Sequence, residues 1–210
     1  MNPVRLALAC AMAFTCLVRT SSATTVIPPT LDELVERAGS VVRTRALDTR
    51  CEWRGEGDER RIVTVVTFAV DETIVGPAQE TVELEFLGGE IDGERMFVAG
   101  QTLFAPGHED ILFVSRQLNA VTPLVRMMFG RYLVAEHEDG RAFIARANGT
   151  PLLATDQVSA PINNPPEGEV LAMVLAAGPM TPDAFADAIR ESARQQGRSD
   201  VSASVGGQDK

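Results

Sequence analysis

The feature that most constrains this chain is a series of short apolar segments, separated by turns that contain glycine or proline, between residues 40 and 145. The clearest segment is 81–87, where Val82, Leu84 and Phe86 alternate with polar residues. A period of two places the apolar side chains on one face of a β-strand. Many short strands between such turns are typical of barrels and sandwiches, so the pattern predicts a mostly β fold.

Further strands are expected on the same grounds, and the glycines mark where the chain bends. Gly88-Gly89 allows a bulge or sharp bend after the 81–87 strand. Residues 90–94 are expected to form an acidic loop. The remaining predicted strands are 40–46, 62–70, 96–98 and 110–115, followed by a hairpin of 131–136 with 141–145.

Helix signals stand at the two ends of this strand-rich region. Thr30 and Glu33 form a capping box ahead of an apolar face, which predicts a helix over 30–38 that ends at Gly39. Near the carboxyl end, Thr181 followed by Pro182 marks the start of a helix over 182–195. A further helix is expected over 170–176.

The first 23 residues have the pattern of a Sec-type signal peptide. Arg5 precedes an apolar core, Leu6 to Val18, that is too short to span a bilayer, and small residues precede a cleavage site after Ala23. We therefore expect a periplasmic or secreted protein. The expected division is a signal peptide at 1–23, a β domain at 24–160, a helical extension at 161–197 and a disordered tail at 198–210.

The charge balance excludes some classes of partner. Removal of the leader leaves 17 basic and 29 acidic residues, a net charge of −12. Such a surface repels phosphate backbones and anionic lipid headgroups, so nucleic-acid binding is not expected. After the leader, no stretch is long enough to cross a membrane. A basic protein surface or a cation is compatible with this charge, and the sequence does not set the oligomeric state.

Cys51 is the one cysteine that remains after the leader is removed, so no intrachain disulfide is expected and packing must hold the fold. An ordinary strand cysteine is the expected role. A thiol that joins this chain to a partner, as in an envelope structural protein, is the alternative.

Few residues have the spacing of a catalytic set. His108 and His137 each begin a His-Glu-Asp tripeptide at a turn, which allows a metal-assisted hydrolase as an alternative function if the two turns meet in space. The spacing is not that of a helical zinc motif. The sequence also lacks a nucleophile elbow and a glycine-rich phosphate loop. We therefore expect a non-enzymatic protein without a cofactor.

Two segments are candidates for binding. The acidic residues Glu90, Asp92 and Glu94 alternate with Ile91 and Gly93, without the twelve-residue pattern of a calcium hand. Trp53 lies in the second segment, 52–58. Loops at one rim of a rigid scaffold often carry binding function, so we expect these two segments to contact a partner.

A family resemblance rests on the strand pattern. It begins with Leu-Val-Glu-Arg-Ala-Gly-Ser-Val-Val at 34–42 and continues through 61–70, 82–89, 96–100 and 110–114. Over roughly residues 31–135 the chain resembles a group of small uncharacterised exported bacterial proteins. More remotely, it is similar to the OB-type barrel of tissue inhibitors of metalloproteinases and netrin-like domains.

The resemblance implies an OB-like β-barrel of five or six strands with helices packed on it, and an exported protease as a possible partner. The chain departs from the inhibitors at their reactive end. They begin with a cysteine that chelates the zinc of the target, whereas the mature chain would begin Thr24-Thr25-Val26, with no cysteine before Cys51. The inhibitory mechanism and its site residues therefore do not carry over.

Overall fold

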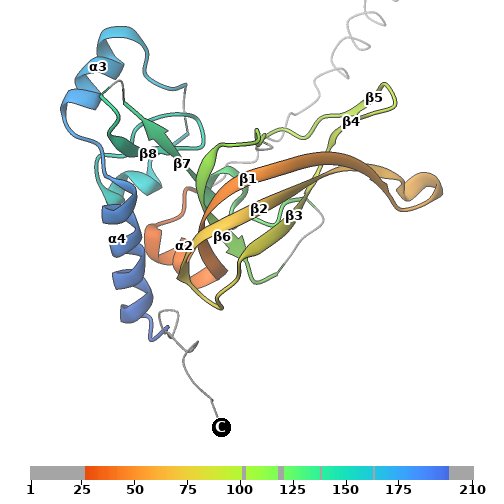
Figure 1. Ribbon diagram of the computed structural model, residues 1–210, viewed down its shortest axis with the longest axis horizontal. Helices are drawn as coiled ribbons and strands as arrows, with labels where there is room; N and C mark the ends of the chain where they lie inside the picture. Colours follow the sequence, from red (N-terminus) through yellow and green to blue (C-terminus); the bar gives the residue numbers. More distant parts are fainter. Residues whose placement is uncertain (1–26, 101–102, 118–120, 138, 163, 199–210) are drawn as a thin grey trace, which may run out of the picture.

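The structure is a computed structural model that describes residues 27–100, 103–117, 121–137, 139–162 and 164–198 (Figure 1). The predicted signal peptide and residues 199–210 of the predicted tail lie outside these ranges. Among the described residues, no helix is both long and apolar enough to cross a bilayer.

A six-stranded antiparallel sheet forms the centre of the molecule, with the strand order β3-β2-β1-β6-β7-β8. Two short strands, β4 and β5, form a separate hairpin. The bounds are β1 (Ala38–Arg54), β2 (Arg61–Val75), β3 (Thr81–Leu87), β4 (Gly89–Ile91), β5 (Glu94–Met96), β6 (Glu109–Ser115), β7 (Arg131–Glu136) and β8 (Ala142–Arg146).

The mostly β class is confirmed, but the expected closed barrel is not observed. In the described part of the chain, β3 and β8 are the two edges of an open sheet and do not pair with each other. The outer edge of β8 is already occupied, because the Ile144 amide donates to Met180 O and the Leu152 amide donates to Ile144 O, both at 2.8 Å. Closure into a barrel would require β8 to pair with β3, but the outer edge of β8 already has other backbone partners.

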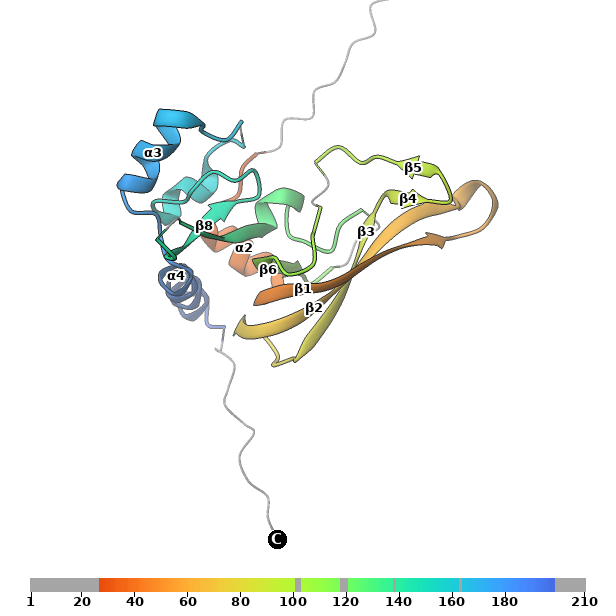
Figure 2. The ribbon, with the colours of Figure 1, turned by 45° about the horizontal axis from the view of Figure 1, so that its top comes forward.

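The strands β1 and β2 are much longer than the sequence pattern predicted. They pair from Val41 with Val75 to Arg54 with Arg61 and are joined by the 3₁₀ turn η1 (Gly57–Glu59). Their far half extends beyond β6 as a curved projection (Figures 1 and 2). We call residues 47–67, together with the β4–β5 hairpin, the arm. Register shifts between Val41 and Asp48 bend β1 where the arm leaves the sheet.

The β4–β5 hairpin corrects two predictions. Residues 90–94 are part of a hairpin rather than a loop, and the strand expected at 96–98 ends at Met96. The two tip residues, Asp92 and Gly93, have φ values of 53° and 81°. Both φ values are positive, as a tight two-residue hairpin turn requires, and Asp-Gly is a preferred pair for it.

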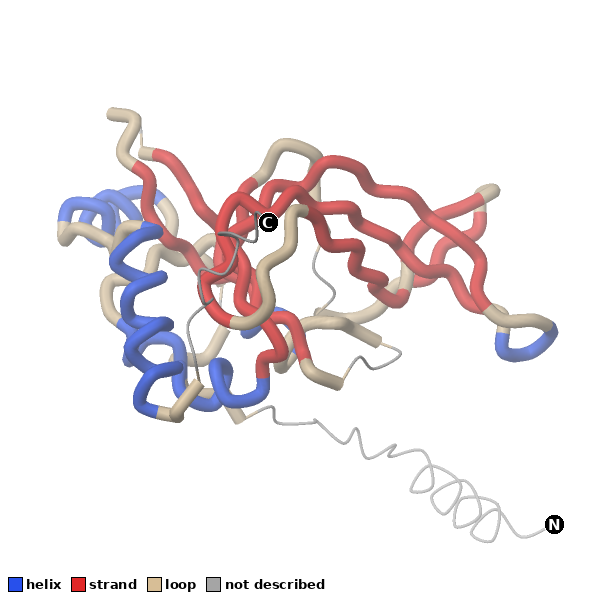
Figure 3. Tube along the Cα trace, turned by 60° about the horizontal axis from the view of Figure 1, so that its bottom comes forward, coloured by secondary structure: helices blue, strands red, loops and turns tan. Residues whose placement is uncertain are grey.

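The described residues contain three α-helices and, besides η1, the 3₁₀ turns η2 (Met127–Gly130) and η3 (Thr155–Ser159). The helices are α2 (Leu31–Arg37), α3 (Gly168–Ala176) and α4 (Pro182–Gln195). The predicted caps are confirmed, since Thr30 accepts from the Glu33 amide and Thr181 accepts from the Ala184 amide. The helices gather on the side opposite the arm (Figure 3).

Gly39 does not terminate α2 as predicted. The chain passes directly from the helix into β1 at Ala38, and Gly39 lies inside the strand. A Cβ at Gly39 would lie 3.3 Å from the Arg116 Cα, so the close approach of that backbone explains the glycine.

The core has two parts, one on each face of the sheet, because Ile111 and Phe113 of β6 belong to the first and Leu112 and Val114 to the second. Helix α4 belongs to the first part, because Phe185 packs against Tyr132 at 4.7 Å and Phe113 at 6.4 Å between ring centroids. The second part lies under β3 and includes Phe68, Phe86 and the partly buried Phe104. The segment expected as a helical extension therefore supplies core residues to the sheet. Arg198, where the tail was expected to begin, donates a hydrogen bond to Gly39 O.

Candidate functional site

The structure brings the two predicted binding segments to one end of the arm. The hairpin β4–β5 contacts both β1 and β2. Its tip and the turn that joins β1 and β2 project from the same end of the molecule as two separate points (Figure 1). We call residues 53–61 and 91–94 the distal end. Two segments at least thirty positions apart in the sequence thus lie at the same end of the molecule.

The close packing of β4 on β1 and β2 depends on Gly89. A Cβ at this glycine would lie 2.7 Å from both Cys51 Sγ and Thr64 Oγ1. The Thr64 hydroxyl donates to Gly88 O at 2.7 Å, and Cys51 Sγ lies 3.6 Å from Thr64 Oγ1. The half-buried Cys51 thiol therefore lies in β1 beneath the hairpin, in contact with its first residue.

Trp53 lies in β1 at the base of the distal end rather than in a loop. The Arg60 guanidinium carbon is 3.7 Å from the centroid of the indole ring, a cation–π distance. The indole Nε1 is buried and has no hydrogen-bond partner among the described residues. Arg60 thus covers one face of the ring, and Trp53 helps to fix the turn.

The distal end carries an excess of exposed carboxylates. In the part of the chain that the structure describes, Glu56, Asp58, Glu59, Asp92 and Glu94 are exposed and form no ion pair. Glu90 differs, because Arg95 Nε donates to its carboxylate at 2.9 Å. Five unpaired carboxylates outnumber the two arginines of the distal end, Arg60 and Arg61, so its net negative charge suits a cationic partner.

On the face of the arm opposite the β4–β5 hairpin, the charged side chains pair with one another. Arg50 Nη2 donates to Glu83 at 2.8 Å, and Arg54 Nε donates to Glu85 at 2.8 Å. Glu52 contacts both arginines. Hydrogen bonds from Arg54 and then Arg50 lower the pKa of the Glu52 carboxyl. This face therefore contributes less net charge than the distal end does.

Phe97 is a surface residue that the sequence analysis did not select. It follows the hairpin directly and is 83% exposed, more than any other large apolar residue among those described. Exposed aromatic residues beside polar rims are typical of protein interfaces. Phe97 was predicted to lie in a strand over 96–98, and an alternation pattern does not show which side of a short strand is left uncovered.

His108 lies on a wall shared by two shallow cavities of about 580 and 520 Å³. Leu133 is the other residue that lines both. The first cavity also has Glu109 and Glu136 in its lining, but Glu109 is held by Arg45 Nη2 at 2.6 Å. Among the described residues of that lining, Glu136 is thus the one acid without an ion pair. Together with His108 it makes two groups, which are too few to hold a metal ion.

His137 does not join this group. Its Nδ1 lies 3.2 Å from Asp139 Oδ1, at the turn between β7 and β8. Hydrogen bonds from Arg141 lower the pKa of the Asp139 carboxyl to about 2. Among the described residues, no group of three or more histidine, cysteine or acidic side chains could hold a metal ion. The structure therefore does not combine the two histidines into a ligand set.

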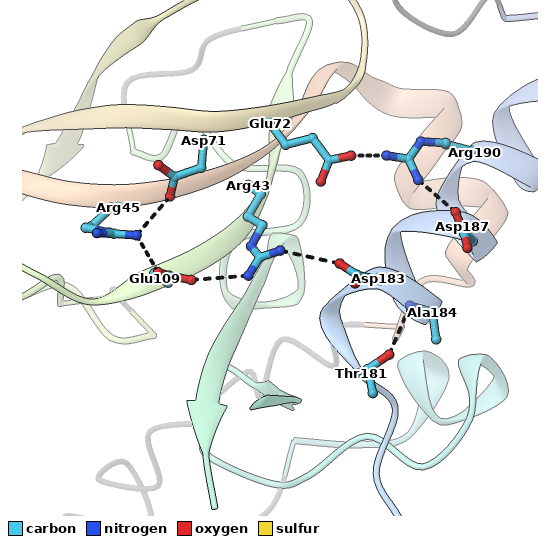
Figure 4. A network of polar contacts seen from close by, with 10 residues as sticks. All are labelled: Arg43, Arg45, Asp71, Glu72, Glu109, Thr181, Asp183, Ala184, Asp187 and Arg190. Carbon is cyan, nitrogen blue, oxygen red and sulfur yellow. Dashed lines mark hydrogen bonds and ion pairs between the residues drawn. The ribbon is translucent and has the colours of Figure 1, made fainter. Parts of the chain in front are cut away.

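A polar network beside the first cavity fixes α4 to the sheet (Figure 4). Arg43 bridges Glu109, at 3.4 Å, and Asp183, at 3.5 Å. Arg45 joins Glu109 to Asp71. Separately, Arg190 of α4 contacts Glu72 of β2. These charges are used within the fold, so the network has a structural role.

Comparisons with protein-family models, curated proteins and solved structures found no match to this chain.

Proposed function

We propose that this protein is a non-enzymatic binding module that recognises a basic surface of an exported protein through its distal end. The observation that carries this proposal is that two acidic segments, 53–61 and 91–94, project from the same end of the arm. Opposite charges at a rim accelerate association and select partners, and an exposed aromatic residue provides an anchor. Asp92, Glu94 and Phe97 combine both features within six residues.

The way the arm is built also supports recognition. The hairpin is seated on β1 by the contact of Gly89 with Cys51 and Thr64, and the Arg60–Trp53 contact fixes the adjoining turn. A surface that is already ordered loses little conformational entropy on binding. The resemblance to an inhibitor fold makes an exported protease the first partner to test.

The test compares two charge reversals of equal size. The mature chain from Thr24 is immobilised, and retention of exported proteins is measured against the double variant Asp92→Lys/Glu94→Lys. The control is Glu167→Lys/Glu169→Lys, because these exposed residues lie at the start of α3 and form no ion pair with a described residue. We expect the wild type and the control variant to retain a stoichiometric partner protein and Asp92→Lys/Glu94→Lys to lose it. We also expect added salt to weaken retention of the partner by the wild type.

Equal retention by both variants would contradict the role of the distal end. A substrate turned over by the purified protein, with turnover lost on a single substitution, would contradict the non-enzymatic assignment.

A further inference from the structure

The two edges of the main sheet differ in how they are covered. On β8, backbone groups of Ile144 bond to Met180 and Leu152, and the Arg146 amide donates to Thr150 O at 2.8 Å. On β3, the Leu87 amide donates to Val121 O at 3.0 Å. Between residues 81 and 85, no backbone hydrogen bond to a described residue outside the sheet occupies this edge. The β3 edge is thus largely open.

The hydrogen bonds at the two ends of β3 show which of its backbone groups face outward. The Val70 amide donates to Glu80 O at 2.8 Å, and the Gly88 amide donates to Ile62 O at 2.7 Å. The backbone N–H and C=O groups of the even-numbered residues in β3 therefore point toward β2. Leu87, which bonds Val121, faces the other way. Backbone direction alternates along a strand. The N–H and C=O groups of Thr81, Glu83 and Glu85 therefore point away from the sheet.

The side chains beside this edge also alternate. Leu84 and Phe86 are buried in the second part of the core. Glu83 and Glu85 lie on the opposite face, with side chains 54% and 43% exposed. Each is bonded to one arginine, which leaves a carboxylate oxygen for a second cation. A strand added to β3 would place one set of its side chains beside carboxylates and the other beside apolar residues.

We infer that the β3 edge binds an extended segment of a partner protein by strand addition, and that this segment alternates basic and apolar residues. Main-chain hydrogen bonds to Thr81, Glu83 and Glu85 supply affinity, and the alternation supplies selectivity. The site is separate from the distal end, so the two proposals can fail independently. Binding here does not require Asp92 or Glu94.

The probe is a fluorescent peptide of about eight residues that alternates lysine and valine, compared with one that alternates glutamate and valine. Binding is measured by anisotropy at low ionic strength. The key pair of variants is Glu85→Pro and Glu85→Gln. Both variants lose the carboxylate, but only the proline variant also loses the backbone N–H of residue 85. This N–H points away from the sheet, so the hydrogen bonds between β3 and β2 do not depend on it.

We expect the lysine peptide to bind and the glutamate peptide not to bind. We expect Glu85→Gln to weaken binding of the lysine peptide slightly, and Glu85→Pro to weaken it about tenfold further. In the wild type, the amide resonances of Thr81, Glu83 and Glu85 should move more than those of Leu84 and Phe86 when the lysine peptide is added.

Equal binding by the two Glu85 variants, or no binding by the wild type, would overturn the inference. If Glu85→Pro fails to fold, a comparison of Thr81→Pro with Thr81→Ala tests the same backbone group at the start of the strand. The NMR measurement of amide resonances uses the wild type and needs no variant. Neither negative result would bear on the charge reversal at the hairpin.

Discussion

Arg131 holds Asp110 by two parallel hydrogen bonds inside the sheet, from Nε to Oδ1 at 2.6 Å and from Nη2 to Oδ2 at 3.1 Å. Asp110 is fully buried and Arg131 is 4% exposed. Burial raises the pKa of the Asp110 carboxyl, while Arg131 and, to a smaller extent, His108 oppose the rise. The guanidinium also packs on Phe104, 4.1 Å from the ring centroid. This pair joins β6 to β7 and to the segment before β6.

Removal of one partner of this pair should be costly. Arg131→Met leaves the buried carboxylate uncompensated, so we expect a loss of about 3–5 kcal/mol in the free energy of unfolding at neutral pH. The double variant Asp110→Leu/Arg131→Met should recover most of it. Urea denaturation measures both, and a loss below about 1 kcal/mol in the single variant would contradict the role of the pair.

The same single variant should respond to acid with a definite sign. Without Arg131 the pKa of Asp110 rises further, so the folded state binds a proton more tightly than the unfolded chain does. Relative to the wild type, Arg131→Met should therefore gain stability as the pH falls from neutral toward the unfolded value of 3.8. Unfolding curves at several pH values test this, and a constant difference would be inconsistent with it.

Phe185→Ala tests whether α4 belongs to the core of the sheet. This side chain has no exposed surface and contacts two aromatic rings, so its truncation should cost about 3–5 kcal/mol. Val170→Ala on α3 is the control, since Val170 is 59% exposed and should change stability by less than about 0.5 kcal/mol. Urea unfolding followed by circular dichroism should show one transition with a lower midpoint in Phe185→Ala. If α4 unfolded separately from the sheet, two transitions would be seen and the assignment would be contradicted.

Cys51 reports on the seating of the β4–β5 hairpin. Gly89→Val would bring side-chain atoms into Cys51 Sγ and Thr64 Oγ1, and a β-branched residue is strained at the φ of 141°. We expect faster labelling of the thiol by a maleimide in this variant. Gly149→Ala is the control, because it also has a positive φ but meets nothing within 4 Å. Equal labelling rates would mean that the hairpin does not protect the thiol.

Asp139 should titrate far below an ordinary aspartate. Its carboxyl accepts hydrogen bonds from the Arg141 side chain at 2.8 Å and the Arg141 amide at 3.1 Å. The pKa of about 2 means that any stability from this contact is present above pH 3.8 and is lost as the pH falls toward 2. Carboxyl NMR should give this value, and Arg141→Gln should raise it toward 3.8. An unchanged value in the variant would contradict the assignment.

Local signals in the sequence were sufficient for most elements. The alternation in 81–87 matches β3 at both ends, and the caps at Thr30 and Thr181 place α2 and α4. These features depend on residues close in the chain. The hairpin at Asp92-Gly93 also has a local signal, the Asp-Gly pair, which the acidic composition of 90–94 obscured.

Non-local features could not be predicted in this way. The full length of β1 depends on its pairing with β2, and the acidic partners of Arg50 and Arg54 lie on β3, two strands away in the sheet. The open sheet depends on the backbone around Met180, far along the chain, covering β8. The same limit applied to the site. The acidic segments were selected from composition, but their position at the same end of the arm is a tertiary property.

The unequal edges of the sheet have a consequence for assembly. Among the described residues, β3 offers the main sheet an open edge while the backbone around Met180 and Leu152 covers β8, so copies of the chain cannot add head to tail along this sheet. Pairing of β3 with β3 of a second copy would consume both open edges and close a two-fold dimer. Growth of a fibre through this sheet would stop at two molecules, so the exposed strand need not carry the aggregation hazard that two free edges would create.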